Sequence, residues 1–226
     1  MGLRDFTRTM QLPMRVWDAP IRLFHWAIVL AVLLSYLSAR AGWMRVHLVS
    51  GETVLALLAF RLAWGFVGSD TARFGQFLAS PADALRQLAA FRQRGPDTQV
   101  GHNAACGWMA LLMLALLAVQ AVSGLLNADR HGSAGPLARY AGERVNAIAG
   151  TVHGTNFTLL AAAAGLHVLA ILAYALVKRH DLVRPMITGV KRLPATTRQP
   201  HMASPILAAT LATLAAMAVG LLATLG

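Results

Sequence analysis

The sequence contains little charge and only one cysteine, Cys106. Charged residues make up 13% of the 226 positions, whereas hydrophobic residues make up 57%. This charged fraction is about half of that in an average soluble domain. The apolar residues also form long runs without the polar positions that the outer faces of a soluble protein need. A single cysteine excludes an intramolecular disulfide and a cysteine-rich metal cluster.

Acidic residues are scarce, and the excess of Lys and Arg gives the chain a formal charge of +11. A charge of this sign can indicate binding to nucleic acid. The basic residues lie between the apolar runs, however, where membrane topology explains them. Membrane lipid is therefore the expected surrounding, and nucleic acid is not an expected partner.

Five apolar stretches are long enough to cross a bilayer, which takes about 20 residues of helix. They cover residues 21–39, 47–67, 103–126, 152–177 and 205–226. The expected fold class is therefore an all-α integral membrane protein, with a four-helix transmembrane bundle and a fifth, C-terminal transmembrane helix.

The segments between the spans indicate how the chain crosses the membrane. Most Lys and Arg residues lie before the first span, between the second and third, and after the fourth. Because basic segments stay in the cytoplasm, the N-terminus is expected inside and the C-terminus outside. The inner segment 68–102 is expected to contain a short amphipathic helix near residues 81–91. Residues 127–152 are expected to form an outer loop.

Four histidines lie inside the expected spans or at their ends: His25, His47, His153 and His167. An ionisable side chain inside a membrane is energetically costly and suggests a functional site. His153 and His167 are fourteen residues apart on one helix, which is just under four turns and about 21 Å of rise. Their side chains therefore face the same way at two depths.

The topology allows only one way to pair the four histidines by their depth in the membrane. His47 and His153 share the outer level, and His25 and His167 share the inner level. Each pair comes from two helices and can bind one iron from both faces of a porphyrin. Iron with two histidine ligands has no open position, which favours electron transfer over oxygen chemistry. The alternative is four unrelated histidines, each bonded to a neighbouring carbonyl group.

Two haems are thus expected, and the residues around them can be named in part. The chain has no Cys-x-x-Cys-His run, so the haems would be of b type, held by side-chain ligands and packing. Arg61 follows His47 by fourteen residues and Arg22 precedes His25 by three. Either cation could pair with a propionate of the inner haem. The alternative for Arg61 is snorkelling toward the membrane surface.

The runs around these histidines are similar to a known family. They are VWDAPIRLFHW at 16–26, RLAWG at 61–65, GHN at 101–103 and MITG at 186–189. Together with His47, His153 and His167, they resemble the bacterial cytochrome b561 and nickel-hydrogenase b-type cytochrome family. The resemblance covers about residues 13–193.

This resemblance implies a diheme cytochrome b of a respiratory chain in the bacterial inner membrane. Its members exchange electrons between the quinone pool and a periplasmic redox partner, such as a c-type cytochrome or a redox enzyme. Residues 1–193 would form the diheme domain, and residues 194–226 would add a short linker and an extra helix. An electron-transfer protein is expected, with quinone oxidoreductase activity and a homodimer as open questions.

A quinone site is expected at the start of the third span. His102 and Asn103 lie there at about the depth of the inner haem. A quinone needs hydrogen-bond donors to its carbonyl groups and a proton path, and histidine titrates in a suitable range. The alternative is that Asn103 caps the helix while His102 lies at the interface.

Two other functions are compatible with parts of the sequence. The chain could anchor a periplasmic hydrogenase or dehydrogenase in the membrane and take its electrons. It could also be a transporter that uses its histidines as ion ligands. Transporter sites lie near the bilayer midplane between broken helices, whereas these histidines occupy two depths. The transporter is therefore the weaker alternative.

Overall fold

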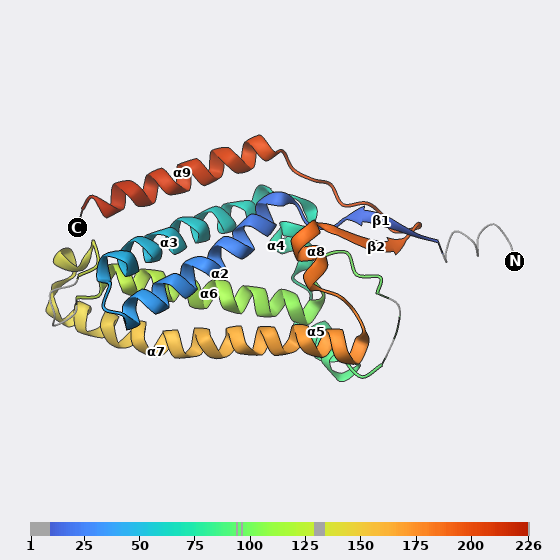
Figure 1. Cartoon of the computed structure of the whole chain (residues 1–226), viewed down its shortest axis with the longest axis horizontal. Helices are drawn as coiled ribbons and strands as arrows, with labels where there is room; N and C mark the ends of the chain where they lie inside the picture. Colours follow the sequence, from blue (N-terminus) through green and yellow to red (C-terminus); the bar gives the residue numbers. More distant parts are fainter. Residues whose placement is uncertain (1–9, 94, 96, 129–133, 226) are drawn as a thin grey trace, which may run out of the picture. The chain divides into compact units, whose positions relative to one another are not determined.

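The described part of the chain is mainly helical. The computed structural model describes residues 10–93, 95, 97–128 and 134–225 (Figure 1). The long helices are α2 (Ala19–Arg40), α3 (Met44–Val67), α6 (Ala104–Leu126), α7 (Ala138–Ala173) and α9 (Pro205–Ala223). All five are long and apolar enough to cross a membrane, with α7 continued by a π-helical turn, Tyr174–Lys178. The expectation of an all-α membrane protein with five spans is confirmed.

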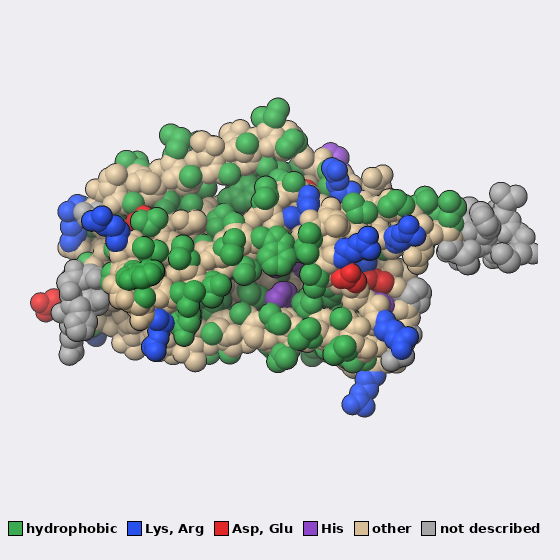
Figure 2. All heavy atoms as spheres, viewed as in Figure 1, with side chains coloured by type: hydrophobic (Ala, Val, Ile, Leu, Met, Phe, Trp, Pro, Cys, Tyr) green, Lys and Arg blue, Asp and Glu red, His purple; other side chains and the backbone are tan. Residues whose placement is uncertain are grey.

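The side chains of these helices are unusually exposed for such apolar elements. In the most apolar part of each helix, at most 28% of the residues are buried. Figure 2 shows apolar side chains spread over the helices on the visible face. Exposed apolar side chains of this kind are stable against lipid and not against water, so the multi-pass membrane assignment follows from the packing as well as from composition.

Smaller elements lie between and beside the spans. They are a 3-10 turn (Asp70–Ala72), α4 (Phe74–Phe77), α5 (Pro81–Ala89), α8 (Val183–Thr188), β1 (Gln11–Arg15) and β2 (Val190–Pro194). The expected short helix near residues 81–91 is confirmed as α5. The antiparallel pair β1–β2 was not expected. Each strand has only five residues, and they pair across almost the whole sequence, so local periodicity gives no signal for them.

Helix α7 is longer than expected. The expected outer loop 127–152 is wrong in its second half, because α7 already begins at Ala138. Gly142 has a φ of 74° and separates the first turn from the main helix; glycine adopts this conformation without strain. Glu143 and Arg144 end the apolar run but not the helix, because a helix can continue beyond the bilayer.

The chain forms two compact units. The first comprises Met1–Arg22, Trp64–Ala110 and Gly165–Ala208, and the second comprises Leu23–Ala63, Leu111–Ala164 and Ala209–Gly226. The first unit contains all three connecting segments that the charge pattern places on one side of the membrane. The second contains the connection 127–137 and the short turn between α2 and α3. This membership agrees with spans that alternate in direction.

A buried carboxylate in the first unit fastens the start of α2. Asp18 is 5% exposed, and its Oδ1 accepts a hydrogen bond of 2.7 Å from the Ile21 amide, as a helix N-cap does. Its Oδ2 accepts one of 3.0 Å from Nε1 of Trp64, whose side chain is completely buried near the end of α3. Asp18 therefore ties the first turn of one span to the last turn of the next.

Candidate functional site

Two histidines face each other in the second unit. His47 lies on α3 and His153 on α7. Their ring centroids are 6.1 Å apart, and the ring planes are at 87° to each other. Both rings are partly buried. The structure thus brings together the two histidines that the sequence assigned to the outer level.

The Nδ1 atom of each ring is held by a main-chain carbonyl group. Nδ1 of His47 lies 2.9 Å from the carbonyl oxygen of Ser35 on α2. Nδ1 of His153 lies 3.0 Å from the carbonyl oxygen of Gln120 on α6. Each Nδ1 also lies near a serine hydroxyl, Oγ of Ser35 at 3.0 Å for His47 and Oγ of Ser123 at 3.2 Å for His153. Because a carbonyl oxygen only accepts, the carbonyl contacts favour the tautomer that carries the proton on Nδ1. Each Nε2 then keeps a lone pair, which is the state that binds a metal.

Further contacts hold the ring of His153 in place. Asn156 is buried, and its Nδ2 donates to the carbonyl oxygen of Leu116 (2.9 Å) and to Oε1 of Gln120 (2.7 Å). A Cβ atom added to Gly124 would lie 3.0 Å from Cε1 of His153. Gly124 therefore leaves room for the His153 ring beside α6. Asn156 holds the side chain of Gln120, whose main-chain carbonyl group lies against Nδ1 of His153.

A cavity of about 490 Å³ adjoins the two rings, within the range of ligand pockets. Residues of α2, α3, α6 and α7 line it. Tyr36 and Phe157 stack on each other in its wall, with ring centroids 5.2 Å apart and an angle of 10°. Gly51 and Gly154 also line it, and an added Cβ at either would meet no atom within 4 Å. At these two positions on α3 and α7, therefore, no side chain projects into the cavity.

The spacing of the rings can be compared with that of two ligands on one metal. A metal–imidazole nitrogen bond is about 2 Å long, and the ring centre lies about 1.1 Å behind that nitrogen for bonds of ordinary length. Two imidazoles on opposite sides of one metal then have centroids about 6.2 Å apart. The observed 6.1 Å, the favoured Nδ1 tautomers and the adjoining cavity fit a haem with two histidine ligands.

The other predicted ligand pair is divided between the units. His25 belongs to the second unit, where its ring makes an edge contact with Trp26, with 4.8 Å between the centroids. His167 belongs to the first unit. Their pairing on one iron stays a prediction.

The two predicted propionate partners have different surroundings. Arg61 is 4% exposed, which does not suit an arginine that extends to the membrane surface. Arg22 donates hydrogen bonds to the main-chain carbonyl groups of Asp18 and Ile187 in the first unit. It therefore helps to fasten the start of α2. A contact with a propionate stays a prediction for both arginines.

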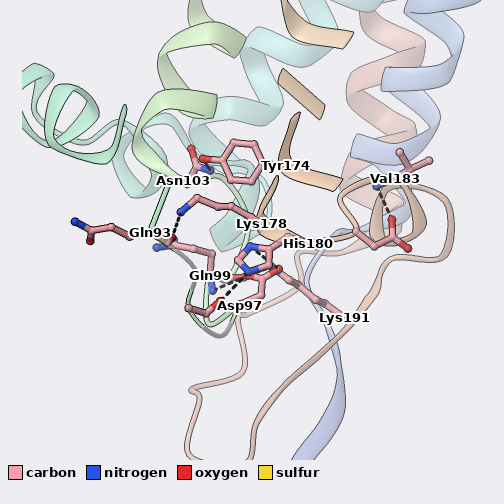
Figure 3. A network of polar contacts seen from close by, with 11 residues as sticks. Gln93, Asp97, Gln99, Asn103, Tyr174, Lys178, His180, Val183 and Lys191 are labelled. Atoms are coloured by element: carbon pink, nitrogen blue, oxygen red, sulfur yellow. Dashed lines mark hydrogen bonds and ion pairs between the residues drawn. The ribbon is translucent and has the colours of Figure 1, made fainter. Parts of the chain in front are cut away.

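The predicted quinone residues lie at the start of α6 in the first unit. Oδ1 of Asn103 accepts a hydrogen bond of 2.8 Å from the amide of Cys106, and its Nδ2 donates to the hydroxyl of Tyr174 at 2.8 Å. Figure 3 shows Asn103 and Tyr174 pointing toward each other. The ring of His102 lies between Trp17 and Phe77, at centroid distances of 4.7 and 4.6 Å. Asn103 caps α6, as the alternative interpretation expected.

Several contributors to the site were not found from the sequence. They are the carbonyl groups of Ser35 and Gln120, the brace Asn156, and the stacked pair Tyr36 and Phe157. A carbonyl group is present at every residue, so no residue type marks it. Asn156 lies three residues after His153, close to one helical turn, and a polar side chain so near an expected ligand is the one signal that was available.

The family model of prokaryotic cytochrome b561 matches residues 16–189. The chain belongs to this family. Comparisons with curated proteins and with solved structures found no match. The family establishes a multi-pass membrane cytochrome with haem b that takes part in electron transfer with redox partners. The histidine pair described above lies entirely inside the matched part of the cytochrome.

Proposed function

We propose that this cytochrome binds two haem b groups and passes electrons between the quinone pool and a periplasmic redox partner. The observation that carries the proposal is the pair His47 and His153, whose spacing and protonation suit one iron between them. The second haem is proposed from the matching depths of His25 and His167. Haem b with two histidine ligands supplies reversible one-electron transfer.

The residues of the outer site have defined tasks in this scheme. His47 and His153 would bind the metal through Nε2, and the carbonyl groups of Ser35 and Gln120 would keep both rings oriented with the proton on Nδ1. Such hydrogen bonds make the ligands more basic. Two histidine ligands also exclude water from the metal, which suits electron transfer without oxygen chemistry.

The inner site is proposed on weaker support. His25 and His167 would be its ligands, and the buried cation of Arg61 would pair with a propionate. Arg22 is a second candidate for this task. His102 and Asn103 would contact the quinone at the start of α6. The support for this location is that these two residues belong to the same unit as His167.

The proposed location is the bacterial inner membrane, with the N-terminus in the cytoplasm and the C-terminus in the periplasm. The excess of Lys and Arg in the first unit supports this orientation. The start of α9 is tied to the end of α3. The His201 amide donates to Oδ2 of Asp70 (2.8 Å), the Asp70 amide donates back to the His201 carbonyl oxygen (3.1 Å), and the Ala203 amide donates to Oγ of Ser69 (2.9 Å). Helix α9 therefore starts on the side where α3 ends.

The family match ends at residue 189. The resemblance found in the sequence ends at about the same place, near residue 193. The two ends together support the proposed division into a diheme domain, 1–193, and a linker with an extra helix, 194–226. We assign α9 to docking of a redox partner or to contact with a second copy of the chain.

The haem content of the purified protein tests the proposal. We expect a reducible b-type spectrum with two haems per chain, measured as the pyridine haemochrome against the protein concentration. His25→Ala and His47→Ala should each remove or convert a different haem, so their difference spectra should not coincide. Identical spectra for the two variants would contradict the pairing, and a wild-type protein without b-type bands would contradict the haem assignment itself.

Gly124 offers a second test at the outer site. Gly124→Ala places a methyl group about 3.0 Å from Cε1 of the His153 ring, so the ring must shift slightly relative to its hydrogen-bond partner. Disturbing such supporting contacts typically weakens metal binding by roughly 10- to 100-fold. We therefore expect faster loss of one haem to a haem scavenger in detergent solution. Gly220→Ala on α9, where a Cβ meets nothing within 4 Å, is the matched control. Equal haem loss from the two variants would be evidence against this placement of His153.

A further inference from the structure

The amphipathic helix α5 is fastened to the start of a membrane span. Within the first unit, the Ala105 amide donates to Oε1 of Gln87 on α5 at 3.1 Å. Nε1 of Trp108 donates to the carbonyl oxygen of Ala79, just before α5, also at 3.1 Å. Ala84, on the same side of α5 as Gln87, is buried. One side of α5 therefore packs toward α6 and caps one of its free amide groups.

A neighbouring face of α5 carries an exposed apolar pair. Leu85 is 67% exposed and Leu88 is 57% exposed. Residues three apart lie on one face of a helix, so the two leucines form one apolar surface. Arg86 is exposed beside them and pairs with Asp83, and Arg92 is exposed just beyond the helix. An apolar face flanked by arginines is typical of helices that lie in a membrane interface.

The contact with Trp108 sets the level of α5 along the membrane normal. Trp108 lies one turn inside the membrane-spanning helix α6, and its ring is 39% exposed. Tryptophan at such a position favours the boundary between headgroups and acyl chains. Because the indole donates to Ala79, the residue that precedes the Ser80 cap of α5 lies at that boundary.

A second attachment holds the segment after α5 at the end of α7. Phe91 makes an edge contact with Tyr174, with 5.2 Å between the ring centroids. Nζ of Lys178 lies 5.7 Å from the Phe91 ring centre and donates to the carbonyl oxygen of Gln93 at 3.3 Å (Figure 3). This attachment adds a lysine to the charges around α5. Both ends of the segment are thus tied to the ends of spans.

We propose that α5 is an interfacial helix that binds the anionic phospholipid surface of the bilayer. Leu85 and Leu88 lie among the upper acyl chains, and Arg86, Arg92 and Lys178 lie at the level of the lipid phosphates. The apolar face of α5 lies beside the start of α6, to which the helix is hydrogen-bonded, and the positive charges are complementary to anionic lipid. This inference does not depend on the number of haems or on the quinone.

Spin labels on α5 test the inference in the haem-loaded protein. Leu85→Cys, Leu88→Cys and Arg86→Cys are each combined with Cys106→Ser, labelled with a nitroxide, and reconstituted in bilayers of phosphatidylcholine and phosphatidylglycerol. Collision with oxygen reports a lipid environment, and collision with a water-soluble nickel chelate reports an aqueous one. Arg86 is the matched control, because its side chain points about 100° away from Leu85. An unchanged haem spectrum shows that each variant is folded.

We expect labels at 85 and 88 to favour oxygen and the label at 86 to favour the chelate. In bilayers of phosphatidylcholine alone, contact of the 85 label with the chelate should rise at least twofold. Equal access of the chelate to 85 and 86 would overturn the interfacial assignment. Dipolar broadening between 85 labels would assign this face to a second copy of the chain instead. If contact of the 85 label with the chelate were the same in both lipid mixtures, the role of the anionic headgroups would be overturned.

Discussion

His153→Leu is expected to lower the haem content from two per chain to one. Leucine fills a similar space but offers no lone pair, and the remaining histidine, His47, then has no counterpart at 6.1 Å. Bis-histidine b-type haem is held by these ligands and by packing, so the loss of one ligand should release or convert the outer haem. The measurement is the pyridine haemochrome of the purified variant, with reduced-minus-oxidised spectra to identify which haem remains.

The partner variant makes this result more decisive. His47→Leu should give the same residual spectrum as His153→Leu, and the double variant should lose no further haem, because in the proposed site both ligands serve one iron. His180→Leu is the control, since Nε2 of His180 lies 3.0 Å from the Gly95 carbonyl oxygen, in the first unit. If the double variant lost both haems, the two histidines would belong to different sites and the proposed pair would be wrong.

Asp18→Ala is expected to destabilise the protein by about 2–4 kcal/mol. Loss of an N-cap costs about 0.5–2 kcal/mol, and loss of a buried hydrogen-bond acceptor costs about 1–3 kcal/mol. Both losses occur here, because the Asp18 carboxylate accepts from Ile21 on α2 and from the fully buried Trp64. Unfolding in mixed micelles, followed by circular dichroism at increasing denaturant, measures the change.

A double-mutant cycle separates the two contributions. Trp64→Phe removes the indole donor and part of a completely buried ring but leaves the cap, so its cost combines a lost hydrogen bond with a cavity. The double variant should be more stable than the sum of the single changes predicts, by about 0.5–3 kcal/mol, as for residues in direct contact. Strictly additive effects would show that the bond between Asp18 and Trp64 contributes nothing to stability.

The features that the sequence predicts well are those that depend on the local composition of the chain. A span needs a long apolar run, and α2, α3, α6 and α9 follow such runs within a few residues. Helix α5 follows from its proline start and its amphipathic pattern. The meeting of His47 with His153 followed from counting turns along α7 and matching depths, without any contact information.

The features that were missed depend on atoms or partners that local composition does not mark. Strands β1 and β2 pair residues 11–15 with 190–194, and neither strand carries a pattern of its own. The early start of α7 at Ala138 was missed because charged residues end an apolar run but not a helix. The tautomers of the paired histidines depend on backbone acceptors, which only coordinates can place.

The use of backbone acceptors affects how the site can change over time. Side chains of Ser35 and Ser123 also lie near the two rings, but the carbonyl oxygens of Ser35 and Gln120 beside Nδ1 of His47 and His153 are groups that any amino acid at these positions would provide. Exchange of either side chain therefore leaves the acceptor in place, and an alignment of relatives need not show a preserved residue there. The ligands can stay oriented through extensive sequence drift, provided that α2 and α6 keep their helical course.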